Sequence, residues 1–157
     1  MNKMNKTMLG GLALAAAFLS GCSNAEYKPL DNSIYINGAA ADPLRIITVG
    51  DASSTTSILV RSAAPAKQTI TVNLAVQQSA LDAYNKRNDA NYVLLPAEFY
   101  TLSATSLKIE QGKVSTPELT VTIKPFTEEL SKSGKKYAIP LSITSVSGAD
   151  LSVLQGE

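Results

Sequence analysis

The chain has 157 residues, a formal net charge of +1, no histidine, no tryptophan and a single cysteine. A charge this close to zero argues against nucleic acid or anionic lipid headgroups as partners. Without histidine and with one thiol, the chain cannot build a Ser–His or Cys–His nucleophile or a His/Cys zinc site. We therefore expect no metal, no cofactor and no enzymatic activity.

The N-terminus has the layout of a secretory signal peptide. Lys3 and Lys6 precede an apolar run over 8–19, which is shorter than the roughly 20 residues that cross a membrane. Cys22 comes next and completes a sequence that resembles the lipobox of bacterial lipoproteins, formed by Leu19, Ser20 and Gly21. Two other interpretations are a membrane-spanning anchor and an ordinary cleaved signal that leaves a free thiol.

The lipobox resemblance implies that Cys22 is diacylated and anchors the mature protein in the outer membrane. It divides the chain into a signal peptide over 1–21, a flexible tether over 22–30 and a folded domain over 31–157. We expect the domain on the cell surface. The periplasmic face is the alternative, because Glu26 is the only acidic sorting cue among the four residues after Cys22.

Beyond the tether, apolar residues alternate with polar ones at a period of two, which is typical of strands with one buried face. The clearest run spans 69–77. The other expected strands carry the apolar sets Ile34/Ile36, Ile47/Val49, Ile58/Val60, Leu107/Ile109, Leu119/Val121/Ile123 and Ile139/Leu141/Ile143. Pro140 cannot donate to a ladder, so the last strand should lie at a sheet edge or be bulged at the proline.

One short helical insertion is expected over about 79–90. Ser79 can cap it, and Leu81 and Tyr84 lie three residues apart and can pack on the sheet. The residues expected to face water are Asp82, Asn85, Lys86 and Asp89. A second helical turn is expected over 127–130.

Short alternating strands separated by turn signals indicate an all-β fold, an antiparallel sandwich. More specific segments are Tyr84-Asn85, Asn91-Tyr92, Leu94-Leu95-Pro96, Tyr100-Thr101-Leu102, Leu107–Gly112, Leu119–Ile123 and Tyr137–Val146 before Ser147-Gly148. Together they resemble the immunoglobulin-like N-terminal domain of unknown function of Bacteroides-type surface lipoproteins, over about residues 27–150. The resemblance implies an immunoglobulin-like β-sandwich with one helical insertion.

In that family the domain precedes another module, such as a family-18 endo-β-N-acetylglucosaminidase, a laminin-G-like fold or a discoidin-type binder. The resemblance therefore implies a spacer or accessory binder, whose partner is a glycan or a downstream or partner surface protein. It transfers no catalytic residues. Family members continue past Ser147-Gly148 into a closing strand, which Leu151, Val153 and Leu154 can begin here. We expect either a fragment of a longer protein or a sandwich with an unfilled edge.

The carboxylates offer little for catalysis or metal binding. Glu128 and Glu129 are adjacent, so their side chains diverge instead of facing each other across a substrate. Asp82 and Asp89 lack the dense acidic spacing and the loop glycine of a calcium site. We interpret both pairs as solvated surface.

Sugar binding fits the residues better than catalysis does. Aromatic rings can stack on sugar faces and amides can hold hydroxyl groups. The candidate glycan contacts are Tyr84, Tyr92, Tyr100, Asn85 and Asn91. The alternative is that these rings pack the helical insertion against the sheet.

The sequence thus predicts a non-catalytic surface lipoprotein domain that serves as a spacer or accessory binder in glycan capture or processing. One alternative is a fimbria-like structural subunit or adhesin, completed by a donor strand at its open edge. Another is the N-terminal fragment of a surface glycosidase whose catalytic module lies elsewhere.

Overall fold

The computed structural model describes residues 33–39, 43–148 and 152–153. The signal peptide, Cys22 with its lipobox, and the tether over 22–30 lie outside the described residues, as do Leu151 and Leu154. No described helix is both long enough and apolar enough to span a bilayer.

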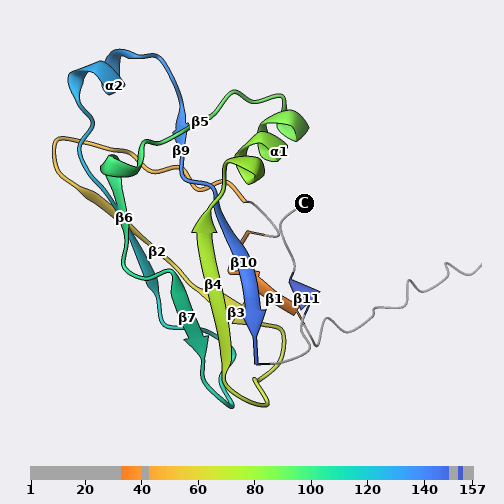
Figure 1. The fold of residues 1–157 in the computed structure, drawn as a ribbon. Helices are drawn as coiled ribbons and strands as arrows, with labels where there is room; N and C mark the ends of the chain where they lie inside the picture. The colour runs from red at the N-terminus through yellow and green to blue at the C-terminus, as the bar shows by residue number, and fades with distance from the viewer. Residues whose placement is uncertain (1–32, 40–42, 149–151, 154–157) are drawn as a thin grey trace, which may run out of the picture.

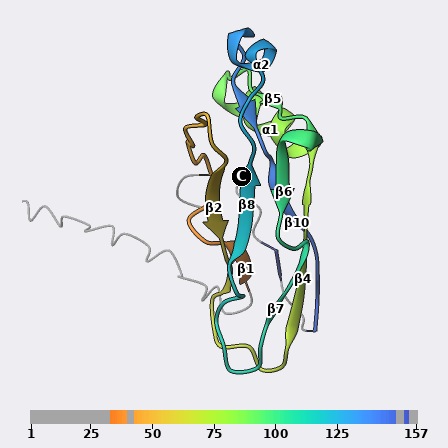
Figure 2. The same ribbon diagram turned by 90° about the vertical axis from the view of Figure 1, so that its left-hand side faces the viewer.

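The described strands form the two layers of an immunoglobulin-like β-sandwich (Figure 1). One layer contains β11 (Ser152–Val153), β1 (Ser33–Ile36), β3 (Val60–Ser62), β2 (Ser54–Ile58), β8 (Leu119–Ile123) and β6 (Tyr100–Leu102). The other contains β10 (Leu141–Ser147), β4 (Ile70–Val76) and β7 (Ser106–Ile109), in that order. Figure 2 shows β2 and β8 on one side of the molecule and β4 and β10 on the other.

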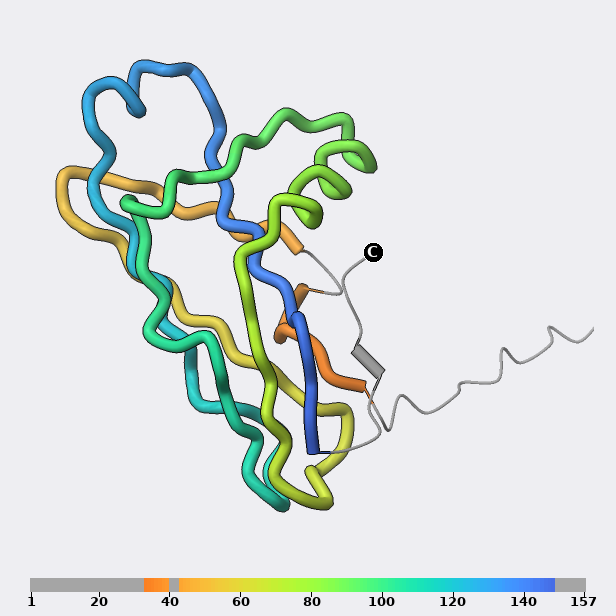
Figure 3. The backbone as a smooth tube through the Cα atoms, viewed as in Figure 1, coloured from red at the N-terminus to blue at the C-terminus, as the bar shows by residue number. Residues whose placement is uncertain are grey.

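β2 and β3 are two parts of one bent strand, separated only by Leu59. β3 continues the ladder with the segment before β8, because the Ser62 N–H donates to the Val114 carbonyl and the Thr116 N–H donates to the Val60 carbonyl. The first layer is therefore continuous from β1 to β6. The tube in Figure 3 follows the chain from β6 into β7, which belongs to the second layer.

The main core is built on the alternation of β4. Ile70, Val72 and Leu74 are buried, and the residues between them are partly exposed. Ile109 of β7 pairs with Ile70, and Leu107 pairs with Val72, so the register gathers apolar side chains on one face. The same cluster contains Ile34, Val60, Leu119 and Ile143. The strands predicted around 69–77, 107–109 and 119–123 are confirmed.

Two helices and a few short elements complete the fold. These are α1 (Gln78–Asn88), β5 (Val93–Leu94), the 3₁₀ turn η1 (Ala97–Phe99), α2 (Glu128–Lys132) and β9 (Tyr137–Ala138). β5 and β9 pair in parallel. The turn expected over 127–130 is confirmed, and the Thr127 hydroxyl caps α2 by accepting from the Leu130 N–H.

The helical insertion is confirmed, but its expected Ser79 cap is wrong. The N-cap residue is Gln77, which is extended and makes no side-chain capping bond. Gln77 still prolongs the β4–β10 ladder, because its N–H donates to the Pro140 carbonyl. The helix therefore begins at the very next residue, which places Ser79 inside the first turn.

The segment that contains Ile47 and Val49 forms no strand, contrary to the expectation. The apolar alternation provides a face that packs on a second cluster around Leu95, Val121 and Ile123. Side-chain hydrogen bonds connect this segment to β2: Arg45 donates to the Thr56 hydroxyl, and the Ser54 hydroxyl donates to the Thr48 carbonyl.

The last strand, β10, lies at the edge of its layer among the described strands, as Pro140 predicted. It begins at Leu141, directly after the proline. The register shift lies between Ile143 and Ser145, so the bulge is not at Pro140.

Ile109→Ala should lower the free energy of unfolding by about 2–5 kcal/mol, because it leaves a cavity at a side chain with 0% exposure. Ile46→Ala is the matched control, since Ile46 is 85% exposed. Its effect should stay within about 0.5 kcal/mol. Urea denaturation monitored by circular dichroism measures both. Similar losses for the two variants would contradict this assignment of the core.

Candidate binding groove

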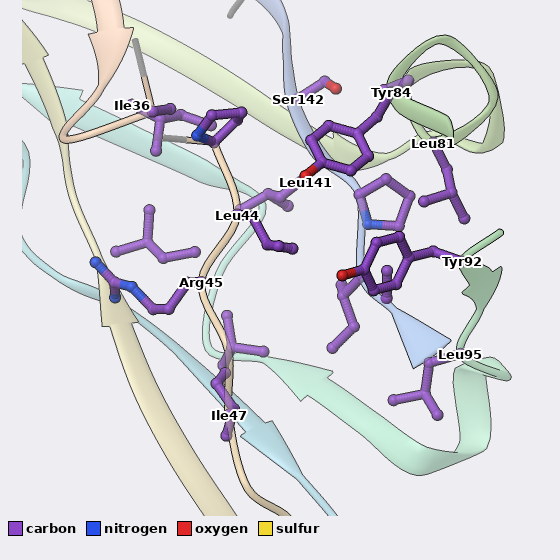
Figure 4. Close-up of a pocket in the computed structure, with 18 of the residues that line it drawn as sticks. Ile36, Leu44, Arg45, Ile47, Leu81, Tyr84, Tyr92, Leu95, Leu141 and Ser142 are labelled. Atoms are coloured by element: carbon purple, nitrogen blue, oxygen red, sulfur yellow. The ribbon is translucent and has the colours of Figure 1, made fainter. Parts of the chain in front are cut away.

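Two of the sequence-predicted site residues, Tyr84 and Tyr92, line a mostly apolar groove of about 1490 Å³. One wall is formed by the end of β1 and by residues 43–49, which we call the strap. The other wall is formed by α1, β9 and β10. Figure 4 shows Leu44 of the strap opposite Tyr84, Tyr92 and Leu141. We call this hollow the β10 groove.

α1 is held against the groove by its apolar side and by its end. Leu81 is 3% exposed and lines the groove. Asp89 is the C-cap residue of the helix, and its left-handed conformation (φ 48°) turns the chain back. The Asp89 N–H donates to the Asn85 carbonyl. This sharp return brings Tyr92 alongside the helix.

Asn85 ties the returning chain to α1 through a pair of hydrogen bonds. Its Nδ2 donates to the Tyr92 carbonyl (2.8 Å), and its Oδ1 accepts from the Tyr92 N–H (3.0 Å). The expectation that Asn85 faces water is wrong: the residue is half-buried, because its amide replaces a backbone partner for Tyr92. Both hydrogen-bonding ends of this side chain are therefore occupied within the protein.

The same bonds bring two of the predicted tyrosines together. The rings of Tyr84 and Tyr92 meet edge to face, with centroids 5.9 Å apart and an interplanar angle of 63°. Figure 4 shows both hydroxyl groups directed into the β10 groove, on the side of Leu44. Their hydroxyl groups form a polar rim on a mostly apolar wall.

The remaining predicted contacts lie elsewhere. Tyr100 is paired with Ile123 in the first layer and packs on the second cluster, outside the residues that line the groove. Asn91 is exposed and also does not line the groove. The structure thus joins Tyr84 with Tyr92 and separates Tyr100 and Asn91 from them.

Sequence reasoning missed the cations of the groove. Arg45, Arg87 and Lys135 line it, and no aspartate or glutamate is found among its described lining residues. Arg45 is held toward β2 by bonds from Nη1 to the Thr56 hydroxyl (3.0 Å) and to the Ser57 carbonyl (2.6 Å). The sequence shows only that Arg87 and Lys135 stand in basic pairs.

The described lining of the groove offers groups that can bind a ligand, and it contains no carboxylate side chain. Glu128 lies on α2, where it forms an ion pair with Lys132, and it does not line the groove. Within the described parts of the chain, no three His, Cys, Asp or Glu residues gather as metal ligands. Tyrosine hydroxyls, exposed cations and apolar walls can hold a ligand.

A family model described as a "-like, N-terminal domain" matches residues 30–150. The search of curated proteins found no match.

Several solved structures share the fold. A proposed carbohydrate-binding protein from Bacteroides ovatus ATCC 8483 is 24% identical, with a TM-score of 0.56, over 70% of this chain and 30% of that one. EndoBT-3987 from Bacteroides thetaiotamicron, solved with a Man5GlcNAc product, is 21% identical, with a TM-score of 0.51, over 81% and 26%. A B. ovatus protein of unknown function is 18% identical, with a TM-score of 0.53, over 73% and 38%.

At these identities the likeness shows the fold alone. The chain also spans only 26–38% of the length of these three structures.

Asn85→Ala should destabilise the protein by about 1–3 kcal/mol, because it leaves the N–H and carbonyl of Tyr92 without their side-chain partner. Asn91→Ala removes the same amide from an exposed position and should cost less than about 0.5 kcal/mol. Thermal unfolding monitored by circular dichroism compares them. Equal melting temperatures for the two variants would show that the Asn85 bonds do not hold this wall.

Proposed function

Because the chain belongs to the family described as a "-like, N-terminal domain", we propose that it is the non-catalytic domain of a bacterial surface lipoprotein. Its role is that of a spacer or accessory binder in glycan capture or processing. The observation that carries this proposal is the family match over residues 30–150, which covers most of the chain.

The chemistry of the chain supports a role without catalysis. Histidine is absent from the sequence, and its one cysteine is the predicted lipid attachment site. The groove residues offer hydroxyls, cations and apolar surface, and none of them is a carboxylate in the described lining. A paired-carboxylate mechanism of glycoside hydrolysis has no constellation to use there.

A role in glycan handling is supported by the two groove tyrosines. Tyr84 and Tyr92 present hydroxyls at the rim and half-buried rings behind them. Two proteins that share the fold support it as well: one is a proposed carbohydrate-binding protein, and the other, EndoBT-3987, was solved with a Man5GlcNAc product. A module elsewhere in the same polypeptide or complex would supply the main specificity, since this chain spans a minor part of each relative.

The proposed location is the outer membrane, facing the outside of the cell. The support is the sequence around Cys22, which resembles a lipobox, and the short segment after it, which the sequence predicts to be a tether. Two acyl chains on one residue give stable anchoring.

Cys22→Ser should abolish lipid attachment, because a serine cannot form the thioether to the glyceryl lipid. Cells that express each form are labelled with radioactive palmitate and separated into membrane and soluble fractions. We expect the native protein to carry label and stay with the outer membrane, and the variant to lose both. Labelled Cys22→Ser protein would disprove attachment at this residue.

Tyr84→Phe combined with Tyr92→Phe should weaken glycan binding several-fold, because it removes both rim hydroxyls and keeps the ring packing. Tyr100→Phe is the control outside the groove. Retention on immobilised N-glycans, plant polysaccharides and mucin is measured alongside the melting temperature. If no glycan retains the native protein, only the spacer role remains. Equal retention of all variants would place the sugar contacts elsewhere.

A further inference from the structure

The charged side chains in the described lining of the β10 groove all have the same sign. They belong to Arg45, Arg87 and Lys135, and each of them is a cation. The chain as a whole is nearly neutral, with 14 lysines and arginines against 13 aspartates and glutamates. The positive charge is therefore a property of this groove and not of the whole protein. Cations gathered in one groove attract a negatively charged ligand.

Arg87 lies next to the tyrosine rim on α1. It stands in the last turn of the helix, three residues after Tyr84, and residues at this spacing are neighbours on a helix surface. Both residues line the groove. The nearby acids Asp82 and Asp89 do not line it, and Asp82 accepts a hydrogen bond from Gln78 instead. This side of α1 thus presents a cation beside a tyrosine hydroxyl.

Lys135 comes to the rim from the segment that leads into β9. The carbonyl of the next residue, Lys136, accepts from the Val93 N–H at 2.8 Å. Because Tyr92 directly precedes Val93, this bond brings the backbone around Lys135 close to Tyr92. Lys135 and Tyr92 both line the groove. The rim thus has one cation on the side of each tyrosine.

The side chains of Arg87 and Lys135 are available to a ligand. Both residues are exposed, and within the part of the chain that the structure describes neither side chain forms an ion pair or a hydrogen bond. Arg45 differs, because its guanidinium already donates to the Thr56 hydroxyl and to the Ser57 carbonyl. Arg45 therefore adds positive charge to the wall, whereas Arg87 and Lys135 also offer unused donors.

The size and polarity of the groove suit several sugar units. Pockets for small molecules have volumes of about 300–1,000 Å³, and this groove has about 1490 Å³. A sugar ring has apolar C–H faces and polar hydroxyl groups. The groove offers apolar walls to the faces and the hydroxyls of Tyr84 and Tyr92 to the polar groups (Figure 4).

We propose that the β10 groove prefers anionic sugar chains, whose carboxylate or sulfate groups bind Arg87 and Lys135 while neighbouring hydroxyls bond to Tyr84 and Tyr92. This inference rests on the proposed role in glycan binding and names the class of glycan. The planar guanidinium of Arg87 can hold two oxygens of one anionic group at once, and the ammonium of Lys135 adds a second positive charge. Uncharged glycans lack the partner for both cations and bind more weakly.

The test measures the binding of the full-length protein to two matched pairs of fluorescent oligosaccharides. The first pair is a galacturonate hexamer and its fully methyl-esterified form, which keeps the sugar rings and loses the charge. The second pair is a sulfated galactan hexamer and its desulfated form. Fluorescence anisotropy should show about tenfold tighter binding of the charged member in at least one pair. The pair that responds identifies the anion as carboxylate or sulfate, and added salt should reduce the difference.

Arg87→Gln with Lys135→Gln should reduce the preference for the charged sugar to about twofold or less, because it removes both unpaired cations of the rim. Binding of the uncharged sugar should stay the same. The matched control is Lys86→Gln with Lys136→Gln, which removes two positive charges at neighbouring exposed positions that do not line the groove. The control should keep the native preference, and both variants should keep the native melting temperature.

Equal binding of the charged and uncharged members of both pairs would overturn this proposal and leave the glycan-binding role intact. An equal loss of preference in the control variant would also overturn it, because the effect would then come from the net charge of the protein. Hexaglutamate carries six carboxylates without sugar rings, and binding as tight as that of the galacturonate hexamer would show that the groove selects charge alone. If none of the four oligosaccharides binds, the anionic preference is wrong, and retention on N-glycans, plant polysaccharides and mucin decides the glycan-binding role separately.

Discussion

The alternating residues of β4 are the feature on which the core and the groove both depend. Ile70, Val72 and Leu74 bury one face of the strand between the two layers. The same strand pairs with β7 on one side and with β10 on the other, which leaves β10 at the edge. Its ladder continues to Gln77, so the position of its last bond also decides where α1 begins. A register slip of one residue would expose this face and displace the helix.

Short-range polar contacts then shape the groove that β4 positions. Asn85 fixes Tyr92 against α1, and Arg45 fixes the strap against β2. In each case one of the two partners, Tyr92 or Arg45, lies in a segment that forms neither helix nor strand. A few side-chain contacts around the sandwich therefore shape the groove. Binding surfaces of this kind can differ between proteins that share one fold.

The groove brings together side chains of different chemistry. Tyrosine hydroxyls lie at the α1 side of the groove, and Leu44 of the strap lies opposite them. Histidine is absent from the sequence, so a nucleophile activated by histidine is not available to this chain.

The sequence by itself determined the strands of the core, the helical insertion and the classes of chemistry that the chain excludes. These properties are local, since a period of two or a missing residue type is visible in any short window. The tertiary structure alone decided that Asn85 turns inward, that the strap is no strand, and that Tyr84 meets Tyr92 but not Tyr100. It also decided that Arg45, Arg87 and Lys135 share one groove. These residues are far apart in the chain and come together only because the two layers pack. No local sequence pattern can therefore predict that they line one groove.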